Sequence, residues 1–177
     1  MTISTTASAT SPVTAENSTV TVSTVQDCHL NNPNNASVND NTYGVGSCAG
    51  WDVTDVLDFK SFNSGNGLGI PSGATIQGIV VQCNWYFSRD YVAPSVRLLK
   101  GGVVAGDNKG STSSILPLSA EATTTYGGAA DLWGTTWTPN DINATNFGVR
   151  VGLEADDAGG ATINWDSCSV TVHFTGG

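Results

Sequence analysis

The chain has 177 residues, of which 6 are lysine or arginine and 15 are aspartate or glutamate, for a formal net charge of -9. This length suits a single domain, and the charged share of 12% is about half of the usual value. A pI near 4.2 with few, scattered basic residues excludes an electrostatic surface for nucleic acid or an anionic membrane. No apolar run approaches the roughly 18 residues of a membrane span.

The first 17 residues are rich in Thr, Ser and Ala. They predict a flexible N-terminal arm over 1–17, followed by one folded domain over 18–177. Because the arm has few apolar residues, it cannot form a core by itself. It is either a disordered tail or an arm that becomes ordered on a neighbouring subunit. It has no basic region and no apolar core, unlike a secretory signal, so assembly in a cytoplasm is expected.

The first half of the domain shows the alternation of apolar and polar residues that is typical of strands. Residues 18–25 predict a half-buried strand, and 51–62 predict a strand with a kink. The turn residues between them, at 26–50, predict a long loop. A long strand follows from 76, and 94–100 predict a shorter one. The long strand places these apolar side chains on one face: Ile79, Val81, Cys83, Trp85 and Phe87.

The second half begins with a Ser/Thr/Ala-rich segment, 111–130, that carries no clear period. Thr138 and Pro139 then predict a helix start, with Thr as N-cap and Pro in the first turn. The helix is limited to one or two turns because alternation resumes at Phe147. A last strand over 162–174 leaves its polar side chains, including Asp166, mostly toward solvent. The fold class is therefore all-β, an antiparallel β-sandwich of jelly-roll-like type with one short helix.

Four cysteines occur, and no two of them form the C-x-x-C pair of a zinc site. Cys28 and Cys48 bracket the Asn-rich loop. They can close a disulfide in an oxidising compartment and stay reduced in a reducing one. Cys83 and Cys168 lie within apolar alternation, where buried thiols acting as small hydrophobic side chains are expected.

No catalytic or cofactor motif is present. His29 and His173 are isolated, no serine lies in a G-x-S-x-G turn, and no phosphate-binding loop or metal-binding helix motif occurs. Asp52, Asp55 and Asp58 recur every three residues, and 156–157 hold two more carboxylates. These groups are either Ca²⁺ ligands or, as is more usual, solvated surface charge. We expect no enzyme activity, no metal and no cofactor.

Aromatic residues are the remaining candidates for ligand binding. Trp133, Trp137 and Tyr126 could form a platform on which sugar rings stack. The other interpretation is that the two tryptophans anchor the turn at the helix start and contact no ligand.

Several long segments resemble a β-sandwich module of tailed-phage virion structural proteins, of the capsid decoration and fibre type. They are IPSGATIQGIVV, VRLLKGGVVAGDNKG, TYGGAADLWGTTWTPNDINATNFGVRVGLE and TINWDSCSVTVHFT, with NNPNNASVNDNTYG as the opening. Together they cover nearly all of the folded part. The resemblance implies a structural or adhesive part of a phage particle and carries over no catalytic residues.

The main implication is a capsid decoration (cement) protein on the outer head surface that stabilises the shell. Its partners would be the major capsid protein of the same phage and further copies of itself, in a homotrimer. It would assemble in the host cytoplasm and reside on the capsid exterior. The alternative is a fibre or adhesin domain of the tail or head that binds host-surface glycans.

Overall fold

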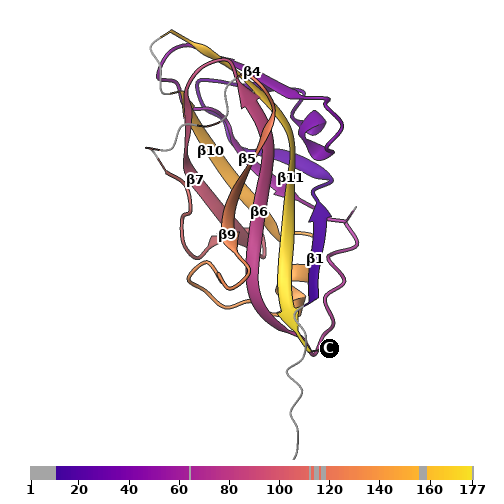
Figure 1. Cartoon of the computed structure of the whole chain (residues 1–177). Helices are drawn as coiled ribbons and strands as arrows, with labels where there is room; N and C mark the ends of the chain where they lie inside the picture. Colours follow the sequence, from indigo (N-terminus) through magenta and orange to yellow (C-terminus); the bar gives the residue numbers. More distant parts are fainter. Residues whose placement is uncertain are drawn as a thin grey trace, which may run out of the picture.

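The computed structural model describes residues 11–63, 65–111, 113, 116, 119–155 and 159–176. In these residues two antiparallel sheets pack face to face (Figure 1). Sheet A consists of β1 (Ser11–Glu16), β3 (Leu30–Asn31), β4 (Gly44–Cys48), β6 (Thr75–Phe87), β9 (Ala122–Gly128) and β11 (Ala161–Thr175). Sheet B consists of β2 (Thr19–Thr24), β5 (Val56–Lys60), β7 (Tyr91–Lys100), β8 (Val103–Ala105) and β10 (Gly148–Ala155). The all-β sandwich is confirmed.

The chain crosses repeatedly from one sheet to the other, as in a jelly roll. The order in sheet A is β3-β4-β11-β6-β9, and the order in sheet B is β2-β5-β10-β7-β8. The long strand β11 pairs with β6 along one edge and with both β4 and β1 along the other. It is therefore the central strand of sheet A.

The core lies between the sheets and follows the alternation of β6 and β11. The five apolar side chains that the sequence places on one face of the long strand, from Ile79 to Phe87, are all fully buried. A row of aromatic rings in this core begins in sheet B, runs along sheet A and returns to sheet B, and consists of Phe59, Trp165, Trp85, Phe87 and Tyr91. Ring centroids 4.6–5.6 Å apart are in the range of favourable aromatic pairs.

The predicted helix is α1 (Pro139–Asn143). The Thr138 hydroxyl accepts a hydrogen bond from the Asp141 N–H, and the Asp141 carboxylate accepts one from the Thr138 N–H at 2.8 Å. This reciprocal capping box satisfies two free N–H groups of a short helix. A 3-10 turn, η1 (Pro33–Ser37), lies inside the predicted loop and was not expected.

Residues 11–16 of the predicted N-terminal arm belong to the folded domain instead, because they form β1 on the edge of β11. Asn17, which is 2% exposed, holds this strand in place. Its side-chain oxygen accepts a hydrogen bond from the Cys168 N–H, and its amide donates to the Ala36 carbonyl. The remainder of the predicted arm, 1–10, lies outside the described residues.

Two of the aspartates that were expected to be solvated are buried. Asp55 is 5% exposed and accepts hydrogen bonds from the backbone N–H groups of Gln26 and Leu30. Asp58 is 4% exposed and pairs with Arg150 across the β5–β10 ladder. Both carboxylates are structural, because buried charge persists only where it is paired or hydrogen-bonded.

The cysteines divide into two pairs. Cys28 and Cys48 are joined by a disulfide, which ties the loop ahead of β3 to the end of β4. Cys83 and Cys168 are free thiols and are fully buried.

Asp166 also differs from its expected solvent-facing place, because β11 carries a bulge there. Trp165 pairs with Trp85 and Ser167 with Asn84, so Asp166 is the extra residue. It is fully buried, and its Oδ2 atom has no hydrogen-bond partner among the described residues. Bulges often redirect a side chain in this way.

The replacement of Asp166 by asparagine is expected to stabilise the protein at neutral pH. Burial raises the pKa of Asp166, and the carboxylates of Glu121 and Asp40 raise it further. The folded state therefore binds this proton more tightly than the unfolded chain does. The stabilisation that comes from binding this proton is complete below the ordinary carboxyl pKa. It is lost as the pH rises through the raised pKa of Asp166 in the folded state.

Asp166→Asn removes the buried charge. It should raise the free energy of unfolding at pH 7 by about 1 kcal/mol and flatten its dependence on pH above 4. Urea unfolding followed by circular dichroism between pH 4 and 8 measures both effects. Asp27→Asn, the same charge change at an exposed side chain, is the control. An Asp166→Asn protein that is less stable than the wild type at pH 7 contradicts the prediction.

Candidate functional site

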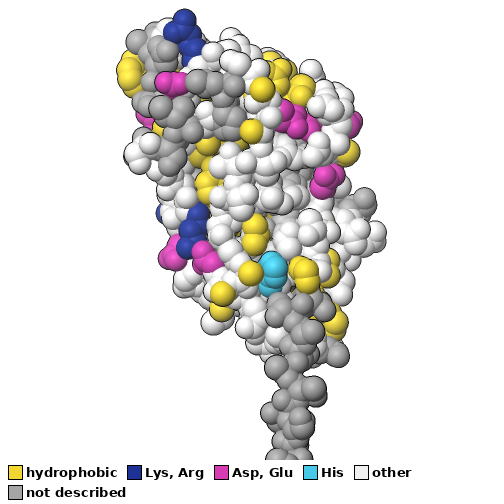
Figure 2. All heavy atoms as spheres, in the orientation of Figure 1, with side chains coloured by type: hydrophobic (Ala, Val, Ile, Leu, Met, Phe, Trp, Pro, Cys, Tyr) yellow, Lys and Arg dark blue, Asp and Glu magenta, His cyan; other side chains and the backbone are white. Residues whose placement is uncertain are grey.

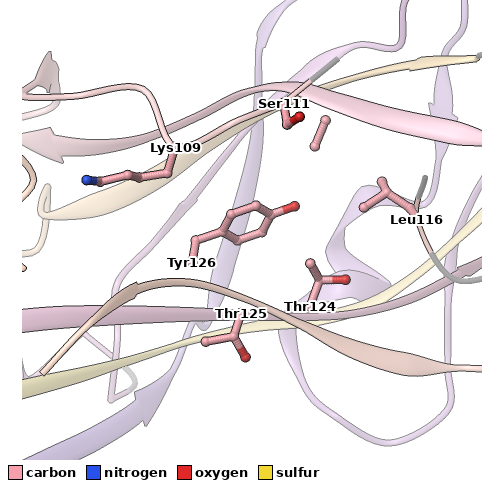
Figure 3. Close-up of a pocket in the computed structure, with 7 residues that line it drawn as sticks. Lys109, Ser111, Leu116, Thr124, Thr125 and Tyr126 are labelled. Atoms are coloured by element: carbon pink, nitrogen blue, oxygen red, sulfur yellow. The ribbon is translucent and has the colours of Figure 1, made fainter. Parts of the chain in front are cut away.

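A cleft of about 290 Å³ opens where the edge strand β9 of sheet A faces the first half of β7 in sheet B. Among the described residues, seven line it: Ala93, Lys109, Ser111, Leu116, Thr124, Thr125 and Tyr126. They come from β7, from the segment after β8 and from β9. In Figure 3 the Tyr126 ring lies across the middle of the cleft, between Ser111 on one side and Thr124 on the other.

The wall of the cleft opposite β9 is held by backbone hydrogen bonds to β7. The Ser111 N–H donates to the Ala93 carbonyl at 2.7 Å, and the Leu116 N–H donates to the Tyr91 carbonyl at 2.9 Å. Gly110 approaches the Ala93 carbonyl so closely that a Cβ atom would collide with backbone. The sequence therefore needs glycine at this position to bring the wall against β7.

Tyr126 and Thr124 provide the aromatic and hydroxyl groups of the cleft. Tyr126 is half-buried, and burial raises its pKa well above the usual tyrosine value, with the neighbouring Cys83 and Cys168 thiols adding to the effect. It therefore stays a neutral phenol. The Thr124 hydroxyl accepts a hydrogen bond from the Trp85 indole N–H at 2.8 Å. Its own proton remains available to another acceptor.

Lys109 borders one end of the cleft, and its ammonium points away from the Tyr126 ring (Figure 3). Its Nζ atom lies 2.9 Å from Asp131 Oδ2 and 3.7 Å from Asp107 Oδ2. The hydrogen bond to Asp131 raises the pKa of Lys109, and the same bond lowers the pKa of Asp131. Both groups are thus charged at neutral pH. The ammonium also lies 5.8 Å from the centroid of the Trp133 ring, within reach of a cation–π contact.

Of the three aromatic residues predicted as a sugar platform, only Tyr126 lines the cleft. Trp133 is fully buried, and its indole N–H donates to the Ile79 carbonyl at 2.9 Å. Trp137 is 7% exposed and packs edge-on against Phe147. The platform is therefore wrong for the two tryptophans, which anchor the turn ahead of α1. Their indole N–H groups are satisfied internally, which allows them to be buried.

Sequence reasoning missed Lys109, Ser111 and Thr124. For Lys109 and Ser111 the available signal was the run of glycines beside them, at 101, 102, 106 and 110, which marks a loop at the edge of a sheet. Such a signal predicts a loop but not that it packs against β9.

The outer face of sheet A, next to the cleft, is polar and almost uncharged. Figure 2 shows few charged side chains over β6, β9 and β11. Asn84 accepts a hydrogen bond from the Thr123 hydroxyl and donates one to the Ser167 hydroxyl. Tyr43 and Tyr86 meet edge to face, with ring centroids 5.2 Å apart.

The structure brings together no catalytic or metal-binding set among the residues that it describes. His29 contacts Asp55 in the loop ahead of β3, whereas His173 lies in β11 opposite Pro12 and Gly78. No three His, Cys, Asp or Glu side chains in the described ranges are arranged to hold a metal ion. No described helix has the length and apolar character needed to cross a membrane.

No family model matches the sequence, and no curated protein matches it significantly. Solved structures with some similarity are carbohydrate-binding modules. A mutant of the family 29 module CBM29-2 gives a TM-score of 0.41 at 8% identity, covering 91% of this chain and 90% of that one. The family 11 module of the cellulosomal cellulase Lic26A-Cel5E of Clostridium thermocellum gives 0.38 at 9% identity, covering 99% and 91%. The C-terminal CBM6 of LamC, a marine laminarinase from Zobellia galactanivorans, gives 0.34 at 11%, covering 91% and 99%.

These TM-scores and sequence identities are too low to assign a ligand of those modules to this chain. Nothing in the comparisons links it to phage virion proteins. The predicted cement role, the homotrimer, the contact with a major capsid protein and the place on the capsid exterior therefore stay predictions. The number of copies of this protein per phage particle, relative to the major capsid protein, would test them.

Proposed function

We propose that this protein is a non-catalytic binding module that takes a sugar residue of a glycan into the cleft at β9. The observation that carries the proposal is the chemistry of the cleft. It combines one aromatic ring with side-chain hydroxyl groups and a lysine side chain in a space of about 290 Å³.

A sugar ring has an apolar face of C–H groups and an edge of hydroxyl groups. The face of the half-buried Tyr126 ring can stack on the C–H face of the sugar, because aromatic rings provide rigid apolar area. The hydroxyl edge of the sugar can bond to Ser111, Thr124 and Thr125, since each of their hydroxyls both donates and accepts hydrogen bonds. The side chain of Lys109 closes one end of the cleft, and its ammonium is held outside by Asp131 and Asp107.

The volume of the cleft limits the size of the ligand that it can bind. Its volume lies at the lower end of the range for small-molecule pockets. One sugar ring fits better than a long chain. Further residues of a glycan would lie over the outer face of sheet A, because Thr125 at the rim belongs to β9. The amide and hydroxyl groups of that face can exchange hydrogen bonds without removing a charge from water.

The residues around the cleft favour binding over hydrolysis. A glycosidase uses two carboxyl groups on either side of one bond. No carboxylate or imidazole belongs to the described residues that line the cleft. Asp131 and Asp107, the acids nearest Lys109, are engaged with its ammonium group.

Tyr126→Ala is expected to weaken glycan binding at least tenfold, because it removes the only aromatic wall among the described lining residues. A glycan array that includes bacterial surface polysaccharides identifies the ligand, and isothermal titration calorimetry then measures its Kd. Tyr126→Phe keeps the ring and separates stacking from the contribution of the hydroxyl. Circular dichroism verifies that each variant is folded.

Trp51→Ala provides the matched control, since Trp51 is 59% exposed and does not line the cleft. It should bind as tightly as the wild type. Loss of binding in Trp51→Ala with full binding in Tyr126→Ala would move the site elsewhere. An array on which the wild type binds no glycan would overturn the proposed function.

A further inference from the structure

Two free thiols lie opposite one another in the centre of sheet A. Cys83 in β6 and Cys168 in β11 are direct partners in the antiparallel register. Both side chains are fully buried on the inner face, and neither takes part in the Cys28–Cys48 bond. Burial and the neighbouring Cys83 thiol both raise the pKa of the Cys168 thiol.

The backbone hydrogen bonds of Cys168 show whether Cys83 and Cys168 form a hydrogen-bonded or a non-hydrogen-bonded pair of the antiparallel ladder. Its N–H donates to the Asn17 side-chain oxygen, and its carbonyl accepts from the Asn17 N–H, each at 3.0 Å. Both groups therefore point toward β1 and away from β6. Cys83 and Cys168 form a non-hydrogen-bonded pair, in which Cα atoms are about 4.5 Å apart and side chains are closest. Disulfides span Cα separations from about 4.4 to 6.8 Å.

We propose that Cys83 and Cys168 are a redox modification site, which a disulfide oxidant converts into a second disulfide across β6 and β11. One thiolate attacks the oxidant, here oxidised glutathione, and releases one glutathione thiol. The second thiolate displaces the other glutathione from the mixed disulfide. In sum, two protein thiols are oxidised to one disulfide, and one molecule of oxidised glutathione is reduced to two thiols.

Burial decides when the reaction takes place. Both sulfur atoms are closed off in the folded state, and burial raises the pKa of the Cys168 thiol, so little thiolate forms there. The oxidant reaches the pair during folding, before the sheets close. Once formed, the bond is shielded from reductants by the same core.

The test is to refold the full chain from urea in a buffer of reduced and oxidised glutathione, then alkylate the remaining thiols under denaturing conditions. Trypsin separates the two bonds, because no lysine or arginine precedes Lys60. The Cys28–Cys48 bond stays within peptide 1–60. A Cys83–Cys168 bond joins peptide 61–89 to peptide 151–177.

We expect the joined peptides, a loss of two hydrogens from the intact mass compared with the single-disulfide protein, and a urea midpoint higher by about 1 M. Cys83→Ala and Cys168→Ala should each abolish the joined peptides and leave the Cys28–Cys48 bond intact. Recovery of Cys83 and Cys168 as alkylated or glutathionylated residues, while Cys28 and Cys48 are fully linked, would overturn the proposal.

Discussion

Trp165→Ala is expected to lower the free energy of unfolding by about 3–5 kcal/mol, the largest effect of any single change considered for this protein. Trp165 is 1% exposed and joins the two sheets. Its ring centroid lies 4.6 Å from that of Phe59 in sheet B and 4.8 Å from that of Trp85 on the neighbouring strand. Alanine leaves a cavity bordered by both rings, and the rigid strands cannot close it.

Thermal unfolding followed by circular dichroism measures this loss. The midpoint should fall by about 10 °C, given the size of the domain. Trp51→Ala removes the same side chain at a position that is 59% exposed, and it should change the stability by less than about 0.5 kcal/mol. Equal losses for the two variants would show that Trp165 does not connect the sheets.

Arg150→Ala is expected to cost about 3 kcal/mol, because it isolates a buried carboxylate. Arg150 Nε and Nη2 donate to the two oxygens of Asp58 at 2.6 and 2.9 Å. Without them, the one cation left beside Asp58 among the described residues is Lys60, whose Nζ lies 3.6 Å away. The charge then remains inside the protein with its best partner removed. Urea unfolding at pH 7 measures the cost.

The double variant Asp58→Ala/Arg150→Ala shows whether the unpaired charge of Asp58 or the lost packing of Arg150 causes the destabilisation. It removes the unpaired charge as well as the bond, so it should be more stable than Arg150→Ala alone. Arg150→Lys keeps a charge but loses the two-point geometry, and should lie between the wild type and Arg150→Ala. A double variant that is less stable than Arg150→Ala would show that the lost side-chain packing dominates.

The long strands and the short helix could be predicted because their sequence patterns match their local structure. The alternation from Ile79 to Phe87 is the inner face of β6, and the Thr138 cap begins α1. Both patterns follow from backbone geometry, which a single segment carries by itself.

The strands β1 and β9 could not be predicted, because their partners decide their structure. Residues 11–16 are SPVTAE and residues 122–128 are ATTTYGG, so both segments consist mainly of small or polar residues with few large apolar side chains. Each becomes a strand by extending the ladder of a long neighbour, β11 or β6. Propensity in such segments is a weak guide beside the free edge of a sheet.

The candidate site could not be predicted in full for the same reason, because it depends on contacts between segments that are distant in sequence. Tyr126 could be named as an aromatic candidate, but Trp133 could not be separated from it by sequence. The distinction arises because β9 turns Tyr126 toward the wall at Ser111, while the Ile79 carbonyl takes the Trp133 indole into the core. The burial of Asp166 likewise follows from one inserted residue in a ladder, which no local pattern marks.

The central place of β11 has a consequence for the order of folding. β1, β4 and β6 all pair with it, and Asn17 bonds to Cys168 across 151 positions of sequence. Sheet A therefore has no centre until the segment farthest along the chain has been added. Until then β1 has no partner strand and β4 has only its short ladder with β3, so both are open to pairing with other chains. Folding through such distant contacts is slow, so yield on expression and refolding should depend more on protein concentration and time than on the final stability of the core.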